Sequence, residues 1–218
     1  MMRSVYRLAA FAALAGAAAC HKDSTGPSGG GGDANLGSYY GVFGASTGSG
    51  SVGGTVVIVI VASGASGTLT PEGAAGIALT GSYNSGTGAV AVSGGGHSLT
   101  GTITSGELDG TYAGPGGAGS FGTHKGASPS DVVLFCGSYD GDASGVWNLA
   151  KTSNSLVGAY ADDDGGSARL TGTLSGSAIS LTFSGGTASG TLASATSMTG
   201  TWTAGAASGT WTGTSPCP

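Results

Sequence analysis

The sequence predicts an all-β protein made of two tandem copies of an antiparallel up-and-down meander, each with about eight short strands closed as a barrel. Apolar residues alternate with Thr and Ser in strand-length runs such as Leu170–Leu174 and Ile179–Phe183. This period of two gives a strand one dry face and one wet face. The same pattern occurs in the other half of the chain, as in Leu99–Ile103, and no helical period occurs. One large β-sandwich or one continuous sheet is the alternative.

The composition permits a thin core and argues against nucleic acid as a partner. The 218 residues include 47 Gly and 6 Pro, and 39% are hydrophobic. Glycine-rich strands lose more chain entropy on folding than other strands do. Only 8% of the residues are charged and the net charge is -5. Binding of phosphates needs clustered Lys and Arg, which this chain lacks.

The first nineteen residues are predicted to be a signal peptide. Arg3 and Arg7 give a positive start, and Leu8–Ala19 is a short apolar run ending in small residues. This run is too short to span a bilayer, which takes about 20 residues. We therefore expect the protein to be exported.

The residues around Cys20 predict a lipid anchor. Residues 17–20, Ala-Ala-Ala-Cys, resemble the lipobox of bacterial lipoproteins. Ala17 stands where that family usually has Leu, which leaves ordinary cleavage after Ala19 as the alternative. The resemblance implies that Cys20 is lipidated and becomes the mature N-terminus, and His21 after it favours the outer membrane. Residues 20–35 are polar and Gly-rich, as expected of a flexible tether.

The folded part is predicted to consist of residues 36–126 and 127–218, with a linker over residues 123–130. Short motifs recur in the same order in both copies. The matched segments are Gly37–Tyr39 and Gly137–Tyr139, Leu79–Gly81 and Leu170–Gly172, Gly101–Ile103 and Gly190–Leu192, Leu108–Tyr112 and Met198–Trp202, and Gly119–Phe121 and Gly209–Trp211. Thr55–Ala62 is apolar on both faces, which predicts a strand buried from both sides where the copies meet, or else an aggregation-prone edge.

Two cysteines remain if Cys20 carries lipid, and an oxidising compartment favours their pairing. Cys136 precedes the Gly-Ser-Tyr that opens the second copy, and Cys217 closes its final strand. A disulfide between them would join the first and last strands of a barrel. A metal-binding pair is the competing interpretation, but no His or further Cys lies near either position at metal-ligand spacing.

Two motifs have a catalytic or metal-binding form, and each also has a simpler interpretation. Gly44–Gly48 matches the GxSxG motif of hydrolases around Ser46, without the strand–turn–helix context that this motif needs. Asp140, Asp142 and Ser144 match the opening of a calcium loop, but Lys151 occupies the position of its bidentate Glu. A hairpin turn accounts for this second motif.

The histidines and a further acidic turn add no catalytic signal. His21, His97 and His124 are expected in the tether, a hairpin turn and the linker. Asp162–Asp164 form a charged turn first and a weak cation site second. We therefore expect neither enzymatic activity nor a cofactor.

Glycines in the centre of apolar strand faces suggest where a ligand would bind. Missing side chains could leave a cavity lined by Tyr112, Phe183, Trp202 and Trp211, suited to a small apolar or aromatic ligand. The alternative is that the glycines allow strong curvature and the aromatic rings cover the exposed backbone, so that the barrel is filled.

The rhythm of Gly and aromatic residues resembles that of small lipocalin-like and avidin-like antiparallel barrels, and this resemblance implies a fold only. The function we expect is that of a non-enzymatic, membrane-anchored lipoprotein of the bacterial envelope with a structural or binding role. A carrier of a small apolar or aromatic ligand and a hydrolase using Ser46 are the alternatives. The expected partners are the membrane, through the lipid, and a small ligand or an envelope component.

Lipidation can be tested directly. Metabolic labelling with palmitate should mark the wild-type protein, and Cys20→Ser should abolish the label because no thiol remains at the mature N-terminus. Cys217→Ser is the matched control and should keep the label. Labelling that survives Cys20→Ser would exclude the lipid anchor.

Overall fold

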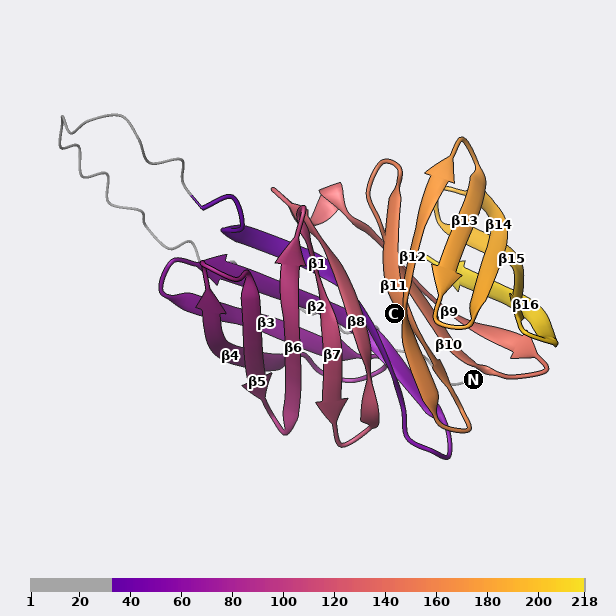
Figure 1. Ribbon diagram of the computed structural model, residues 1–218, viewed down its shortest axis with the longest axis horizontal. Helices are drawn as coiled ribbons and strands as arrows, with labels where there is room; N and C mark the ends of the chain where they lie inside the picture. Colours follow the sequence, from indigo (N-terminus) through magenta and orange to yellow (C-terminus); the bar gives the residue numbers. More distant parts are fainter. Residues whose placement is uncertain (1–32, 218) are drawn as a thin grey trace, which may run out of the picture. The chain divides into compact units, whose positions relative to one another are not determined.

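The computed structural model describes residues 33–217, which form two closed antiparallel barrels of eight strands each (Figure 1). The predicted fold class is therefore confirmed, and the single sandwich and the continuous sheet are wrong. Cys20 and the predicted signal peptide lie outside the described residues. Among residues 33–217, no helix has the length and apolar character needed to cross a membrane.

The first barrel contains β1 (Gly37–Ser46), β2 (Ser51–Val61), β3 (Gly64–Pro71), β4 (Ile77–Asn84), β5 (Ala89–Gly94), β6 (His97–Thr104), β7 (Glu107–Gly114) and β8 (Gly117–Gly126). The 3-10 helix η1 (Pro129–Asp131) follows. The second barrel contains β9 (Val133–Gly141), β10 (Gly145–Lys151), β11 (Ser155–Asp162), β12 (Gly166–Ser175), β13 (Ala178–Phe183), β14 (Gly186–Ser194), β15 (Ser197–Ala204) and β16 (Ala207–Thr214).

Both barrels have the simplest possible topology. Each strand pairs with the strands before and after it, and pairing of β1 with β8 and of β9 with β16 closes the two sheets. Closure leaves no open sheet edge. Antiparallel neighbours need only short hairpin turns, which the many Gly residues supply.

Most of the predicted internal matches fall on strands of the same rank in the two barrels. Leu108–Tyr112 lies in β7 and Met198–Trp202 in β15, seven strands into their respective barrels. The matches on β4 and β12, β6 and β14, and β8 and β16 agree in the same way. The two barrels are thus two copies of one strand plan.

The match between Gly37–Tyr39 and Gly137–Tyr139 is wrong. Phe43 of β1 lies opposite Phe121, whereas Tyr139 of β9 lies opposite Trp211. Because Phe121 and Trp211 are themselves equivalent, Tyr139 corresponds to Phe43. The tripeptide Gly-Ser-Tyr occurs in both copies but at positions that are not equivalent, as the pairing of β1 with β8 and of β9 with β16 shows.

Alternate residues along each strand point inward and fill the interiors, and each barrel has its own buried cluster. Glycines in the strands make room for large rings in the interior, and Trp211 is an example. A methyl group on Gly190 or Gly200 would lie 2.6 Å from its indole ring, too close for any real contact. The ring therefore rests directly on the backbone of both glycines, as expected for an aromatic residue that covers a glycine kink.

The barrels meet through β1 and β8 of the first and β10, β11 and β12 of the second, which we call the barrel interface. Small side chains allow close contact there: a methyl group on Gly122 would lie 3.0 Å from the backbone nitrogen of Gly158. Asn148 donates from Nδ2 to the carbonyl of Phe43 at 2.9 Å. Ala150 and Val157 are fully buried.

The prediction for Thr55–Ala62 holds only in part: β2 contacts β9, β10 and β11 of the second copy, but it is not buried on both faces. Val56, Ile58 and Ile60 of β2 point into the first barrel and are buried. The opposite face is only partly covered, and Val61 is 48% exposed. The copies meet mainly on β1 and β8, whose small residues give little hydropathy signal.

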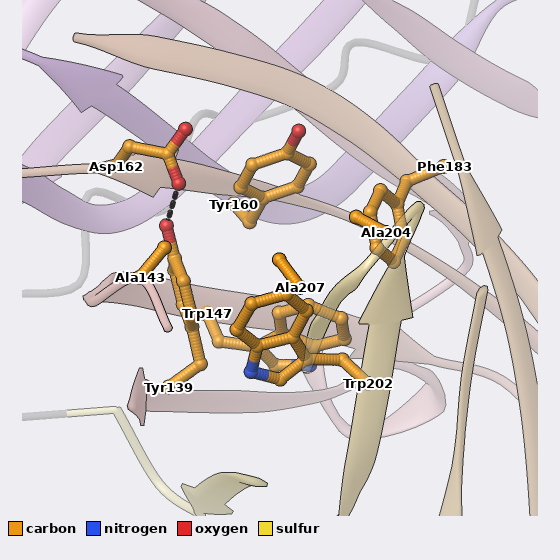
Figure 2. Close-up of a pocket in the computed structure, with 9 residues that line it drawn as sticks. All are labelled: Tyr139, Ala143, Trp147, Tyr160, Asp162, Phe183, Trp202, Ala204 and Ala207. Atoms are coloured by element: carbon orange, nitrogen blue, oxygen red, sulfur yellow. Dashed lines mark hydrogen bonds between the residues drawn. The ribbon is translucent and has the colours of Figure 1, made fainter. Parts of the chain in front are cut away.

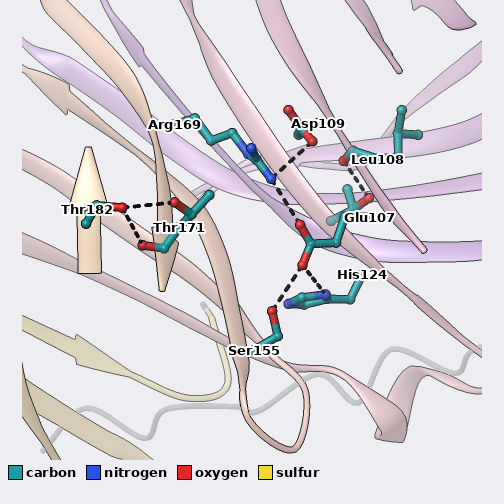
Figure 3. A network of polar contacts seen from close by, with 9 residues as sticks. Glu107, Leu108, Asp109, His124, Ser155, Arg169, Thr171 and Thr182 are labelled. Atoms are coloured by element: carbon teal, nitrogen blue, oxygen red, sulfur yellow. Dashed lines mark hydrogen bonds and ion pairs between the residues drawn. The ribbon is translucent and has the colours of Figure 1, made fainter. Parts of the chain in front are cut away.

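A polar network bridges one part of the barrel interface (Figure 3). The Arg169 guanidinium contacts Glu107 at 3.0 Å and Asp109 at 3.1 Å. Ser155 donates from Oγ to Glu107 at 3.0 Å, and His124 Nδ1 lies 3.6 Å from the same carboxylate. Burial raises the pKa of Asp109, and the adjacent guanidinium opposes that rise.

His124 and Thr123 were predicted to belong to the linker, and this is wrong. Both are buried in β8, where Thr123 donates from Oγ1 to the carbonyl of Leu108 at 2.8 Å. His97, expected in a turn, is the first residue of β6. Its Nδ1 lies 2.7 Å from the Tyr112 hydroxyl.

The predicted disulfide between Cys136 and Cys217 is confirmed. Cys136 lies in β9 opposite Thr214, the last residue of β16, and Cys217 comes three residues after Thr214. The bond thus ties the chain end to the two strands whose pairing closes the second barrel.

Loss of this disulfide should destabilise the second barrel. Closing a loop with a sequence separation of 81 residues is worth about 4.5 kcal/mol in the chain-entropy model. Cys136→Ser with Cys217→Ser should lower the unfolding free energy by roughly that amount in urea titration followed by tryptophan emission. An unchanged midpoint would contradict this stabilising role.

The stability should also depend on pH through His124. Burial lowers its pKa, and the nearby Glu107 carboxylate opposes that change. As the pH falls below about 6.5, an unfolded histidine binds a proton that the folded one still excludes, so stability falls by up to about 1.4 kcal/mol for each pH unit. Between pH 7 and 5, urea unfolding of His124→Gln should show a flatter profile than the wild type. His97→Gln is the control, and equal flattening in both variants would refute the assignment.

Candidate functional site

A cavity of about 130 Å³ lies at one end of the second barrel. It is surrounded by the ends of four hairpins, β9–β10, β11–β12, β13–β14 and β15–β16. Figure 2 shows its lining side chains arranged around a central space. They are Tyr139, Ala143, Trp147, Tyr160, Asp162, Phe183, Trp202, Ala204 and Ala207.

Aromatic rings at steep angles form most of the wall. The Tyr139 ring stands perpendicular to that of Trp202, with centroids 5.7 Å apart, and to that of Tyr160, at 5.9 Å. Phe183 meets Tyr160 edge-on at 5.1 Å. Trp147 and Tyr160 lie more nearly parallel, with centroids 6.2 Å apart and an interplanar angle of 26°.

Trp147 supports the wall from the interior side. Its ring stacks on Trp211 at 5.4 Å with an interplanar angle of 17°. Trp211 in turn covers the glycine backbone of β14 and β15, so the wall rests on a filled barrel centre. Trp147 is buried, and its indole N–H has no acceptor among the described residues.

Asp162 is the only residue with a formal charge in the cavity lining, and the Tyr139 hydroxyl donates a hydrogen bond to it. Burial, followed by this bond to the carboxylate, raises the pKa of Tyr139 far above its usual value. Burial also raises the pKa of Tyr160. Both phenols are therefore neutral at physiological pH, and the carboxylate supplies the local negative charge.

The two acidic hairpin turns at the cavity are held by their own side chains. Asp163 accepts from Ser144 Oγ at 2.8 Å and from Ser51 Oγ of the first barrel at 2.7 Å. These two bonds lower the pKa of Asp163. Asp142 accepts from the backbone nitrogen of Ser208 at 2.8 Å. The first barrel thus helps to position the cavity mouth.

The pairing register of the strands identifies the equivalent positions in the first barrel, and four of the six differ in kind. The matched pairs are Phe43 and Tyr139, Val56 and Trp147, Leu69 and Tyr160, Pro71 and Asp162, Gly94 and Phe183, and Tyr112 and Trp202. In the first barrel Phe43 stacks directly on Tyr112 at 4.8 Å. The aromatic cavity is therefore specific to the second copy.

The structure brings together two of the four predicted ligand-binding residues. Phe183 and Trp202 line the cavity, and Trp211 lies behind Trp147. Tyr112 belongs to the other barrel, where it contacts His97 and Phe43.

Tyr139, Trp147, Tyr160 and Asp162 were not predicted to contribute. Two of their strands carry the same pattern of a central Gly with apolar residues two positions away, and it was passed over there: Phe135, Gly137 and Tyr139 in β9, and Leu156, Gly158 and Tyr160 in β11. A second signal is the alternation of inward and outward residues along each strand. In β9, β10 and β11 it places these aromatic residues at inward positions near the same end of the barrel. Only the register shows that these ends meet.

The other candidate motifs serve as hairpin ends. Ser46 is the last residue of β1, and its Oγ accepts from the Gly48 nitrogen at 3.3 Å. Asp140 accepts from the adjacent Gly141 nitrogen at 2.8 Å. Asp142 and Ser144 bond as described above. Within residues 33–217, no group of three or more His, Cys, Asp or Glu side chains is placed to hold a metal ion.

Comparison with protein-family models, with curated proteins and with solved structures found no match to this chain. The closed eight-stranded antiparallel barrel is the architecture of lipocalins and streptavidin, and it agrees with the fold that the sequence rhythm implied.

Proposed function

We propose that this protein is a non-enzymatic binding protein of the bacterial envelope whose second barrel takes up a small ligand. The observation that carries the proposal is the aromatic cavity, built at positions where the first copy has mostly aliphatic or small residues. The two copies share one strand plan, so the fold alone does not require this change.

The cavity chemistry favours binding over catalysis. The lining contains no Ser, Cys, Lys or His, and its ionisable members are one Asp and two Tyr. Nucleophilic catalysis needs a nucleophile within hydrogen-bond reach of a base. The hydrolase alternative rests on the motif around Ser46, which lies at a hairpin end of the other barrel.

The cavity volume sets the size of the ligand. At about 130 Å³, it is slightly smaller than an engineered cavity of about 150 Å³ that admits benzene. It suits one ring or one compact branched group. Longer molecules would have to extend through the mouth into solvent.

The envelope location is supported by the sequence alone. The predicted signal peptide and the lipobox-like residues before Cys20 imply export and anchoring in the outer membrane. In this proposal the polar residues 20–35 hold the barrels away from the membrane surface, and the first barrel supports the second at the barrel interface.

Tryptophan emission should report binding, because all three Trp residues line or support the cavity. Titration with small aromatic compounds such as toluene and phenol should quench or shift the emission. Ala207→Phe should abolish the change by filling the cavity, with little loss of stability.

Ala206→Phe, at the exposed neighbouring turn position, is the control and should behave like the wild type. Emission that stays unchanged across the panel in the wild type would contradict a small-ligand function.

A further inference from the structure

We infer that the ligand of this cavity carries a quaternary methylammonium group with a net positive charge. The inference rests on the proposed function, because it names the chemical class that the same cavity would bind. Three features carry it: perpendicular electron-rich rings, a carboxylate in the wall, and a mouth with negative charges only.

The first feature is the aromatic wall. The faces of Trp and Tyr rings carry the negative part of the ring quadrupole, and Trp gives the strongest cation–π attraction. Tyr139, Tyr160 and Trp202 surround the cavity from different directions (Figure 2). A spherical cation can contact several faces at once, whereas a flat neutral ring can stack on only one or two.

The second feature is Asp162. Its carboxylate lines the cavity and accepts from the Tyr139 hydroxyl, so it is anchored beside the ring faces. A carboxylate at this place attracts a cationic ligand and gives a neutral one no such gain. The equivalent position in the first barrel is Pro71.

The third feature is the acidic rim, which we define as Asp140, Asp142, Asp162, Asp163 and Asp164. These residues are five of the 11 Asp and Glu in the chain. Residues 140–145, 162–166, 183–186 and 204–207, which form the four hairpin ends around the cavity, contain no Lys, Arg or His. Such a mouth raises the local concentration of cations and repels anions.

The cavity volume and the charge of the acidic rim together restrict the kind of cation that can bind. A trimethylammonium group is close to benzene in size and fits the volume given above. A primary ammonium has three N–H donors to satisfy once it loses its hydration, and the only charged acceptor in the lining, Asp162, already accepts from Tyr139. In glycine betaine or phosphocholine, the anionic group would face the acidic rim. A free cation such as choline therefore fits better than a zwitterion or a phosphatidylcholine headgroup.

The test is isothermal titration calorimetry of the full chain with choline and with 3,3-dimethyl-1-butanol, its neutral isostere. Choline should bind at least about tenfold more tightly. Raising the salt concentration should weaken choline binding and leave the alcohol unaffected. Glycine betaine, phosphocholine and phosphatidylcholine vesicles should each bind more weakly than choline, and tighter binding of any of them would overturn the assignment to a free cation.

Two pairs of variants test the residues. Asp162→Asn keeps an acceptor for Tyr139 and should weaken choline binding about tenfold, whereas Glu72→Gln, at the exposed turn of the first barrel that corresponds to Asp163, should not. Trp202→Leu should weaken choline binding, whereas Tyr112→Leu at the equivalent position of the first barrel should not. Urea titration checks that each variant is folded, and equal effects in a folded pair would overturn the inference.

The outcomes separate the two proposals. If the alcohol and the neutral aromatic compounds bind as tightly as choline, the cation inference fails and the binding function stands. If neither choline nor any neutral compound binds the wild-type protein, both proposals fail.

Discussion

The width of an eight-stranded barrel is set by its strand number, and its interior is just wide enough for side chains to fill. A chain with this architecture can vary only the size of the inward residues at each level. In the centre of the second barrel, Gly190 and Gly200 leave room that the Trp211 ring occupies. Large rings on glycine backbone keep the barrel closed and filled there. The cavity is consequently displaced toward the end, where the hairpins diverge.

Because the chain contains two barrels of the same strand order, the packing of their interiors can be compared within one molecule. Both barrels have the same strand order, and their pairing registers agree except for a bulge between β14 and β15. The first has Val56, Leu69 and a direct stack of Phe43 on Tyr112 at the level where the second has its cavity. The second barrel has aromatic rings at these positions, and several of them meet edge-on around the cavity.

Much of this fold could be predicted from the sequence because strand alternation is a local signal. Leu108–Tyr112 and Met198–Trp202 show both the period and the repeat. The position of the barrel interface could not be predicted, since Gly44, Gly122 and Gly158 have no hydrophobic signature and are recognisable only once two sheets approach. The same reason applies to the site. Trp202 was found through Gly200 on the same face of its strand, whereas the places of Trp147 and Tyr160 in the same cavity lining follow only from cross-strand register. His124 was misplaced because a polar residue in a polar stretch resembles a linker until its partners are known.

The barrel interface also changes what the tandem arrangement means. Ala150, Val157 and Asn148 belong to the second barrel, and residues of the first barrel help to bury them: Tyr40 packs on the cluster of Ala150 and Val157, and Phe43 accepts from Asn148. Separated halves would expose part of this surface to water, although each barrel keeps its own closed sheet and buried core. The covalent connection through residues 127–132 then matters chiefly during folding, when it raises the effective concentration of one half around the other. The two barrels thus resemble a dimer encoded in a single polypeptide. The interior of the second barrel differs from that of the first, although both barrels contribute strands to one shared contact.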